Sequence, residues 1–137
     1  MIVVDSNIIG YLYLNSERSK QAEQAWRKDP QWAAPLLWRS ELRNVLVLYV
    51  RKQLLSSETA REIMEEAINL MIGHEYEVIS SRVLNLAVTS PCSAYDCEFV
   101  GLAQDLGVPL VTVDKQVFEQ FPDIAVSLDK YLSSRRK

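Results

Sequence analysis

The sequence of 137 residues is poor in the residues that mark disulfide scaffolds, zinc sites and flexible linkers. It contains two cysteines, one histidine, four glycines and five prolines. Two cysteines cannot build a disulfide framework, and a single histidine without a Cys–His cluster gives no zinc-binding pattern. With so little glycine and proline, and with no internal repeat, we expect one domain that buries its own core.

Long apolar runs are also missing. Residues 46–50 (LVLYV) fall far short of the ~18–20 apolar residues that a membrane span needs. The N-terminus (MIVVD) has no basic segment of the kind that begins a signal peptide. We therefore expect a cytoplasmic protein that does not contact membranes, in which Cys92 and Cys97 are reduced core or surface thiols.

The charge of the chain does not indicate a nucleic-acid-binding protein. Fifteen basic and 18 acidic residues give a net charge of −3, whereas proteins that bind nucleic acids usually carry a basic surface. Part of this acidity can belong to a metal site, where bound cations would reverse the local sign of the charge. Local basic residues would then have to bind an anionic substrate.

Short apolar runs alternate with amphipathic segments along the chain. Strands are predicted at residues 2–4, 31–34, 77–79, 109–113 and 124–126. Helices are predicted at residues 8–12, 17–28 (capped by Ser16), 36–53, 58–72, 82–88, 95–106 and 116–121. This alternation predicts an α/β domain with a mostly parallel sheet over residues 1–132. Residues 133–137 are predicted to be a basic tail that frays.

Two of the predicted strands end in an acid. Asp5 follows residues 2–4 and Asp114 follows residues 110–113. In open parallel sheets, ligands bind beyond the carboxyl ends of the strands, where both carboxylates would lie. Either residue taken alone is equally typical of a helix cap.

Two further acids interrupt apolar stripes on predicted helices. Glu41 shares a helix face with Trp38 and Val45, and Asp96 lies one turn before Phe99. A carboxylate facing the core is costly unless it is paired or bound to a cation. The alternatives are a buried ion pair with arginine for Glu41 and a favourable helix-dipole interaction for Asp96.

Four converging carboxylates would repel one another and raise each other's pKa, and divalent cations would relieve that repulsion. Ligands that are all oxygen favour hard ions such as Mg²⁺ or Mn²⁺. Such ions activate water and stabilise leaving oxygens in phosphodiester hydrolysis. His74 stands alone, so no Ser–His–Asp or Cys–His nucleophile system is available. The predicted catalytic and metal-binding residues are therefore Asp5, Glu41, Asp96 and Asp114.

At these positions the chain resembles the PIN-domain (PilT N-terminus) family, and within it the VapC-type toxin ribonucleases. The similarity rests on residues 2–7 (IVVDSN), 40–42 (SEL), 94–97 (AYDC) with 102–103 (LA), and 110–114 (LVTVD). The resemblance implies a three-layer α/β/α sandwich with a mostly parallel central sheet of four or five strands. It also implies an Mg²⁺- or Mn²⁺-dependent endoribonuclease that acts as the toxin of a type II toxin–antitoxin pair.

The resemblance extends to supporting residues and partners. Ser6, Asn7 and Thr112 match the family's residues around the acids, although a helix cap and a strand residue are equally good interpretations of Ser6 and Thr112. It further implies an RNA substrate, a homodimer and a small antitoxin protein. From their positions beside the acids, the candidate phosphate-binding residues are Arg39, Arg43 and Lys115. Glu98 is interpreted as a solvated surface acid.

Acids at these positions are also compatible with three other classes of protein. Phosphatases of the haloacid-dehalogenase type need a second aspartate two residues after the first, where this chain has Asn7. Response-regulator receivers need paired acids around the first strand, and Asp5 is alone there. An RNA-processing or RNA-binding PIN protein without a toxin role is the remaining alternative, and the presence of all four acids argues against a pure binding module.

Overall fold

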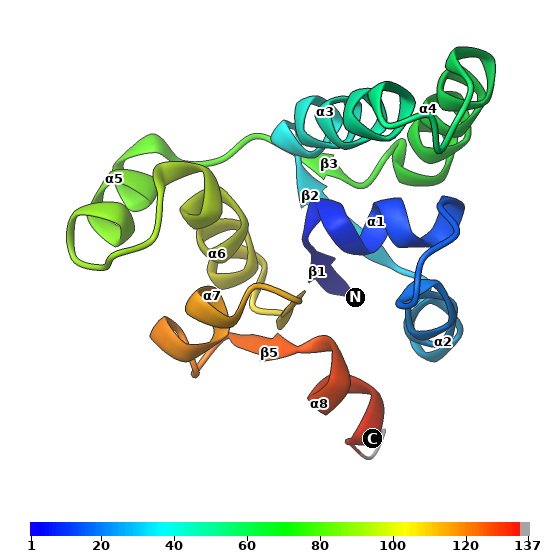
Figure 1. The fold of residues 1–137 in the computed structure, drawn as a ribbon. Coiled ribbons are helices and arrows are strands. Elements are labelled where there is room, and N and C mark those ends of the chain that lie inside the picture. Colours follow the sequence, from blue (N-terminus) through cyan, green and yellow to red (C-terminus); the bar gives the residue numbers. More distant parts are fainter. Residues whose placement is uncertain (135–137) are drawn as a thin grey trace.

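A computed structural model describes residues 1–134 of the chain (Figure 1). Five strands are present in that range: β1 (Ile2–Val4), β2 (Trp32–Pro35), β3 (Glu75–Tyr76), β4 (Leu110–Thr112) and β5 (Ala125–Ser127). The helices are α1 (Ser6–Tyr13), α2 (Ser19–Lys28), α3 (Leu37–Arg51), α4 (Ser57–Met71), α5 (Ser80–Val88), α6 (Ala94–Leu106), α7 (Lys115–Gln120) and α8 (Leu128–Ser133).

The strands form one parallel sheet in the order β3-β2-β1-β4-β5. The central strand β1 pairs with β4 so that Val3 lies opposite Leu110 and Val4 opposite Val111. Helices α5 and α6 lie on one side of the sheet, and α1, α2 and α4 on the other (Figure 1). The expected three-layer α/β/α architecture is confirmed.

The sequence of the central strands explains their position. All three residues of β1 and all three of β4 are buried, as expected for parallel strands covered by helices on both faces. The largest fully buried side chains include Trp32 and Trp38, and Cys92 and Cys97 are free, buried thiols. No helix within residues 1–134 is long and apolar enough to cross a membrane.

Two predicted features are wrong in detail. The third strand lies at Glu75–Tyr76, where it pairs with Ala34 and Pro35, and residues 77–79 are irregular. Ser16 does not cap α2, because that helix begins only at Ser19 and Arg18 occupies the cap position. At the third strand, pairing with the neighbouring strand outweighs the local apolar pattern. At α2, a turn before the helix outweighs the capping pattern of Ser16.

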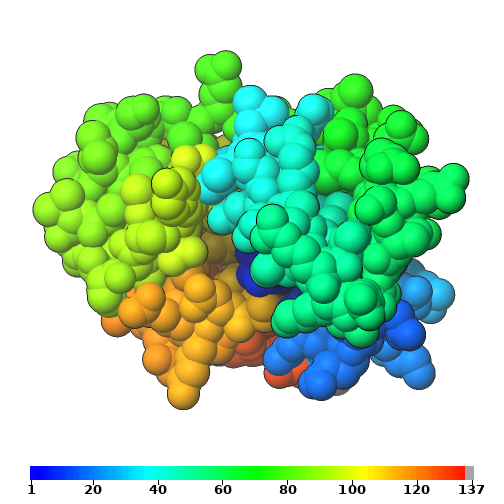
Figure 2. All heavy atoms as spheres, turned by 45° about the horizontal axis from the view of Figure 1, so that its top comes forward, coloured from blue at the N-terminus to red at the C-terminus, as the bar shows by residue number. Residues whose placement is uncertain are grey.

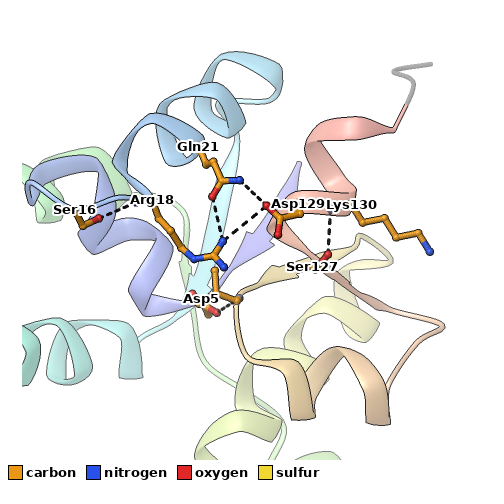
Figure 3. A network of polar contacts seen from close by, with 8 residues as sticks. Asp5, Ser16, Arg18, Gln21, Ser127, Asp129 and Lys130 are labelled. Atoms are coloured by element: carbon orange, nitrogen blue, oxygen red, sulfur yellow. Dashed lines mark hydrogen bonds and ion pairs between the residues drawn. The ribbon is translucent and has the colours of Figure 1, made fainter.

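Helix α8 was not predicted, and contacts with α2 hold it. Figure 3 shows Arg18 and Gln21 converging on Asp129, with Gln21 Nε2 donating to Asp129 Oδ1 at 2.5 Å. Lys28 lies 4.4 Å from the Tyr131 ring centre and donates to the Ser134 carbonyl. Ordered structure thus extends two residues into the predicted tail, whose residues 135–137 lie outside the described range.

A three-way contact fixes the start of α3 against β3. Glu75 accepts hydrogen bonds from Trp38 Nε1 at 2.7 Å and from Arg39 Nε and Nη2 at 2.6 and 2.7 Å. The Glu75 side chain is only 9% exposed, and the hydrogen bond from Arg39 lowers its pKa. Because α3 also carries Glu41, this contact sets the orientation of a candidate site residue.

We predict that Glu75→Ala lowers the free energy of unfolding by about 1.5–3 kcal/mol, since it leaves the buried Trp38 indole N–H without its acceptor. Urea unfolding monitored by circular dichroism measures this change, and Glu77→Ala, at an exposed position nearby, is the control. The difference between wild type and Glu75→Ala should shrink as the pH falls below about 4.3, because a lowered carboxylate pKa contributes stability that acid removes. Equal effects of the two substitutions would contradict the prediction.

Candidate active site

A cavity of about 430 Å³ opens beyond the carboxyl ends of β1 and β4. Figure 2 shows the hollow, with dark-blue N-terminal atoms at its floor and α3, the start of α6 and α7 around its rim. All four predicted acids line this cavity, as do Ser6, Asn7 and Thr112. Side chains from four separate parts of the sequence therefore meet in one place, at the edge where parallel sheets bind ligands.

Asp5 is the most tightly held of the acids. Its Oδ2 accepts hydrogen bonds from Thr112 Oγ1 at 2.5 Å and from Val113 N at 3.0 Å, and its Oδ1 accepts one from Ile8 N at 3.0 Å. Asp5 is thus a helix cap and a cavity residue at once. Burial raises the pKa of Asp5, the three hydrogen bonds oppose this, and the nearby charge of Asp114 adds to the increase.

Glu41 lies on α3 with its carboxylate against α1. The buried Ser6 hydroxyl donates to Glu41 Oε1 at 2.6 Å, so Ser6 supports the site and does not cap the helix. Glu41 has no ion pair with arginine within residues 1–134. Partial burial raises the pKa of Glu41, and the charges of Asp96 and Asp5 raise it further. The cost of placing this acid on an apolar stripe is therefore only partly offset by Ser6.

The other two acids lie at helix starts. Asp96 is in the first turn of α6, where its N–H donates to Ser93 Oγ at 3.0 Å. Asp114 caps α7 by accepting from Gln116 N at 3.0 Å, and its own N–H donates to Thr112 Oγ1 at 3.0 Å. The Thr112 hydroxyl therefore donates to one acid and accepts from the backbone of another, which links the ends of β1 and β4.

The donor chemistry of the cavity suits a hard divalent cation, since its acidic lining offers carboxylate oxygens and no histidine or cysteine. Burial is the main cause of the raised pKa values of Asp5 and Glu41, and the charges of neighbouring acids add to the increase. Within residues 1–134, however, no three acidic, histidine or cysteine side chains are close enough together to hold one ion directly. This spacing fits an ion that keeps several of its waters, as Mg²⁺ does with one or two carboxylates.

The three basic residues predicted beside the acids lie elsewhere. Arg39 is bonded to Glu75, and Arg43 lines a different groove. The side chain of Lys115 is 79% exposed, with its Nζ 3.8 Å from Glu119. None of them lines the cavity. Arg39 and Arg43 each lie two positions from Glu41 on α3, and this spacing points them to another side of the helix.

Several cavity residues escaped the sequence analysis. Ser40, Asn44 and Tyr95 line the cavity without any charge to mark them. Asn44 lies three residues after Glu41, which is the helical spacing that could have indicated it. Glu98, interpreted as a solvated surface acid, is half-buried, and desolvation raises its pKa. Its charge also raises the pKa of Glu41, so it belongs to the electrostatic surroundings of the site.

Comparison with known proteins places residues 2–124 on the model of the PIN domain family. Ribonuclease VapC3 from Pyrobaculum aerophilum is 32% identical over 124 residues, which span 88% of this chain and 95% of that protein. This match extends over nearly the whole of both sequences. The residues that match the family model include all four acids of the cavity.

Solved structures share the fold at lower sequence identity. The crystal structure of PAE2754 from Pyrobaculum aerophilum gives a TM-score of 0.76 at 19% identity and covers 96% of this chain and 92% of that one. A toxin–antitoxin complex from Klebsiella pneumoniae gives a TM-score of 0.66 at 19% identity, with 93% and 98% covered. At these identities the likeness establishes the architecture.

We predict that Glu41→Gln stabilises the protein in EDTA at about pH 7. A carboxylate whose pKa is raised in the folded state costs stability once the pH exceeds that pKa, and glutamine removes this cost. Glutamine Oε1 can still accept from Ser6. The gain should disappear as the pH falls below about 4.3, where wild-type Glu41 becomes protonated in both states.

Urea unfolding at both pH values measures the effect, with Glu65→Gln, at an exposed position on α4, as the matched control. If Glu41→Gln were no more stable than the control at the higher pH, the ionised Glu41 carboxylate would not lower the stability of the folded protein, and the prediction would be wrong.

Proposed function

The chain belongs to the PIN-domain family, and on that premise we propose that it is a ribonuclease that hydrolyses RNA phosphodiester bonds with Mg²⁺ or Mn²⁺. The observation that carries the proposal is the convergence of Asp5, Glu41, Asp96 and Asp114 in one cavity. Four acids without a cationic partner in the lining are costly unless cations occupy the site. Hydrolysis of a phosphodiester is the chemistry that such an oxygen-rich site supports.

The surroundings of each acid indicate its role in the proposed reaction. A bound Mg²⁺ or Mn²⁺ would lower the pKa of water and neutralise the charge that develops on the phosphate. Asp5 and Asp114 are held by backbone N–H groups, so their oxygens keep fixed positions for binding. Glu41 has a raised pKa, which suits a carboxylate that accepts a proton from the attacking water near neutral pH.

The reaction proposed for this site is an in-line displacement. The water oxygen forms a bond to phosphorus while the bond to the leaving ribose oxygen breaks, and the proton lost by the water goes to Glu41. The leaving oxygen takes up a proton from solvent. Ser6 orients Glu41 through its 2.6 Å hydrogen bond, and Thr112 orients Asp5 through its 2.5 Å hydrogen bond, so both hydroxyls act as positioning residues.

We propose further that the protein is the toxin of a toxin–antitoxin pair, forms a homodimer and binds a small antitoxin. The Klebsiella pneumoniae neighbour is itself a toxin–antitoxin complex. A groove of about 490 Å³ between α3 and α4 provides a docking surface. Apolar side chains and three arginines line it: Arg43, Leu46, Val47, Val50, Arg51, Ala60, Arg61 and Met64. Such a lining fits the apolar face of an amphipathic helix with acidic flanks.

The groove and the cavity use different faces of one helix. Glu41 and Asn44 on α3 face the cavity, whereas Leu46, Val47 and Val50 face the groove. A partner seated in the groove would therefore pack on the helix that carries Glu41. A partner that also extended a basic residue into the acidic cavity would block substrate and neutralise the site.

Purified protein should cleave single-stranded RNA with Mg²⁺ or Mn²⁺ and lose this activity in EDTA. Asp5→Asn and Asp96→Asn should each lower kcat/KM by about 100-fold or more, because each removes a charge that would bind the cation. Cleavage of a fluorescent RNA measures the rates. Asp123→Asn, the same substitution at an exposed acid outside the cavity, should leave them unchanged. If both cavity variants cleave RNA as fast as wild type, and circular dichroism shows that their fold is intact, the proposal is wrong.

Induced expression should arrest growth, and the product of a short neighbouring reading frame should relieve the arrest. Val47→Asp puts a like charge opposite an acidic helix. This variant should still arrest growth, but the product of the neighbouring reading frame should no longer relieve the arrest. Val88→Asp, at an 81% exposed position on α5, is the control and should still be relieved. No arrest at all would favour the alternative of an RNA-processing PIN protein without a toxin role. Arrest by Asp96→Asn as strong as by wild type would contradict the proposal that the toxicity comes from RNA cleavage.

A further inference from the structure

Tyr95 is an aromatic residue whose side chain is exposed to solvent. Within residues 1–134 every other tyrosine, phenylalanine and tryptophan is buried or half-buried, whereas Tyr95 is 63% exposed. It lies in the first turn of α6, directly before Asp96, and it lines the mouth of the acidic cavity. A large ring left in water at this position contributes little to the core and offers a face to whatever enters the cavity.

The lining of the cavity makes this ring important for binding an anionic chain. Asp5, Glu41, Asp96 and Asp114 line it, and no lysine or arginine does. Apart from any bound cation, the lining therefore supplies no Coulombic attraction for a polyanion. Base stacking on an aromatic ring is an interaction that adds affinity for single-stranded nucleic acid without a positive charge.

We propose that Tyr95 stacks against one unpaired nucleobase next to the phosphodiester bound at the acids. The inference rests on the proposed ribonuclease function, which already takes single-stranded RNA as the substrate, and adds the residue that recognises a base of it. A base in a duplex is already stacked on its neighbours and pairs across the helix, so it cannot lie flat on the ring. Loops, bulges and unpaired ends would be the substrates.

Kinetics with two variants separate stacking from packing. Tyr95→Leu should raise KM for a single-stranded RNA by about 5- to 100-fold, because it replaces an aromatic face by an aliphatic side chain of similar bulk. Tyr95→Phe keeps the face and should behave as wild type. The kcat should change little in both, since the ring does not touch the reacting phosphate. Substitution of the base beside the cleaved bond by an abasic site should raise KM for wild type and leave KM for Tyr95→Leu unchanged.

A binding measurement tests the ring without relying on cleavage. A single-stranded RNA carrying 2-aminopurine should lose fluorescence on binding to Asp96→Asn protein in Mg²⁺, because stacking quenches this base. The double variant Asp96→Asn/Tyr95→Leu should give no such quenching, and a fully paired RNA of the same sequence should give none with either protein.

The outcomes separate the two proposals. If wild type cleaves no RNA, the ribonuclease proposal fails, and the quenching measurement still decides whether the ring stacks on a base. If Tyr95→Leu cleaves with unchanged KM, or if duplex RNA is cleaved as well as single strands, the stacking proposal is wrong. It is also wrong if sedimentation shows that Tyr95→Leu acts by changing the oligomeric state, since the ring would then belong to a contact between protein chains.

Discussion

The Asp5 carboxylate receives hydrogen bonds from the helix that follows it and from two residues across the sheet, and the candidate site is built around this group. A carboxylate at the end of a buried strand is tolerated only because three donors compensate for its lost hydration. Two of those donors, Thr112 and Val113, lie at the end of β4, and the third lies on the helix that follows β1. The parallel register of β1 and β4 therefore also fixes the geometry of the site. Thr112 extends the constraint to Asp114, whose backbone it also binds.

Much of the fold and the four acids could be predicted from the sequence. Short runs of mostly apolar residues at 2–4 and 110–112 are typical of central parallel strands. They predict the edge of the sheet at which Asp5 and Asp114 lie. Glu41 and Asp96 could be recognised because each interrupts an apolar stripe, a pattern that helical spacing makes visible. These signals lie within single segments, so they can be recognised without knowing which distant segments pack together.

The features that escaped prediction depend on contacts between distant segments. Arg39 binds Glu75 on another element, so its proximity to Glu41 in sequence gave no indication of where its charge lies. Helix α8 has six residues and depends on Lys28 and its neighbours of α2, since so short a helix is not stable by itself. The exposure of Tyr95 was equally invisible, because an aromatic beside an apolar stripe is more often part of the core.

The pairing of the first strand with one near the end of the chain has a consequence for synthesis on the ribosome. Asp5 emerges early, but its partner Thr112 follows 107 residues later, so the central pair of the sheet cannot form until most of the chain has been made. Until then Asp5 lacks its donors across the sheet as well as the wall that α6 and α7 provide. The cavity therefore cannot take shape until residues 110–113 have been added to the growing chain and have paired with β1.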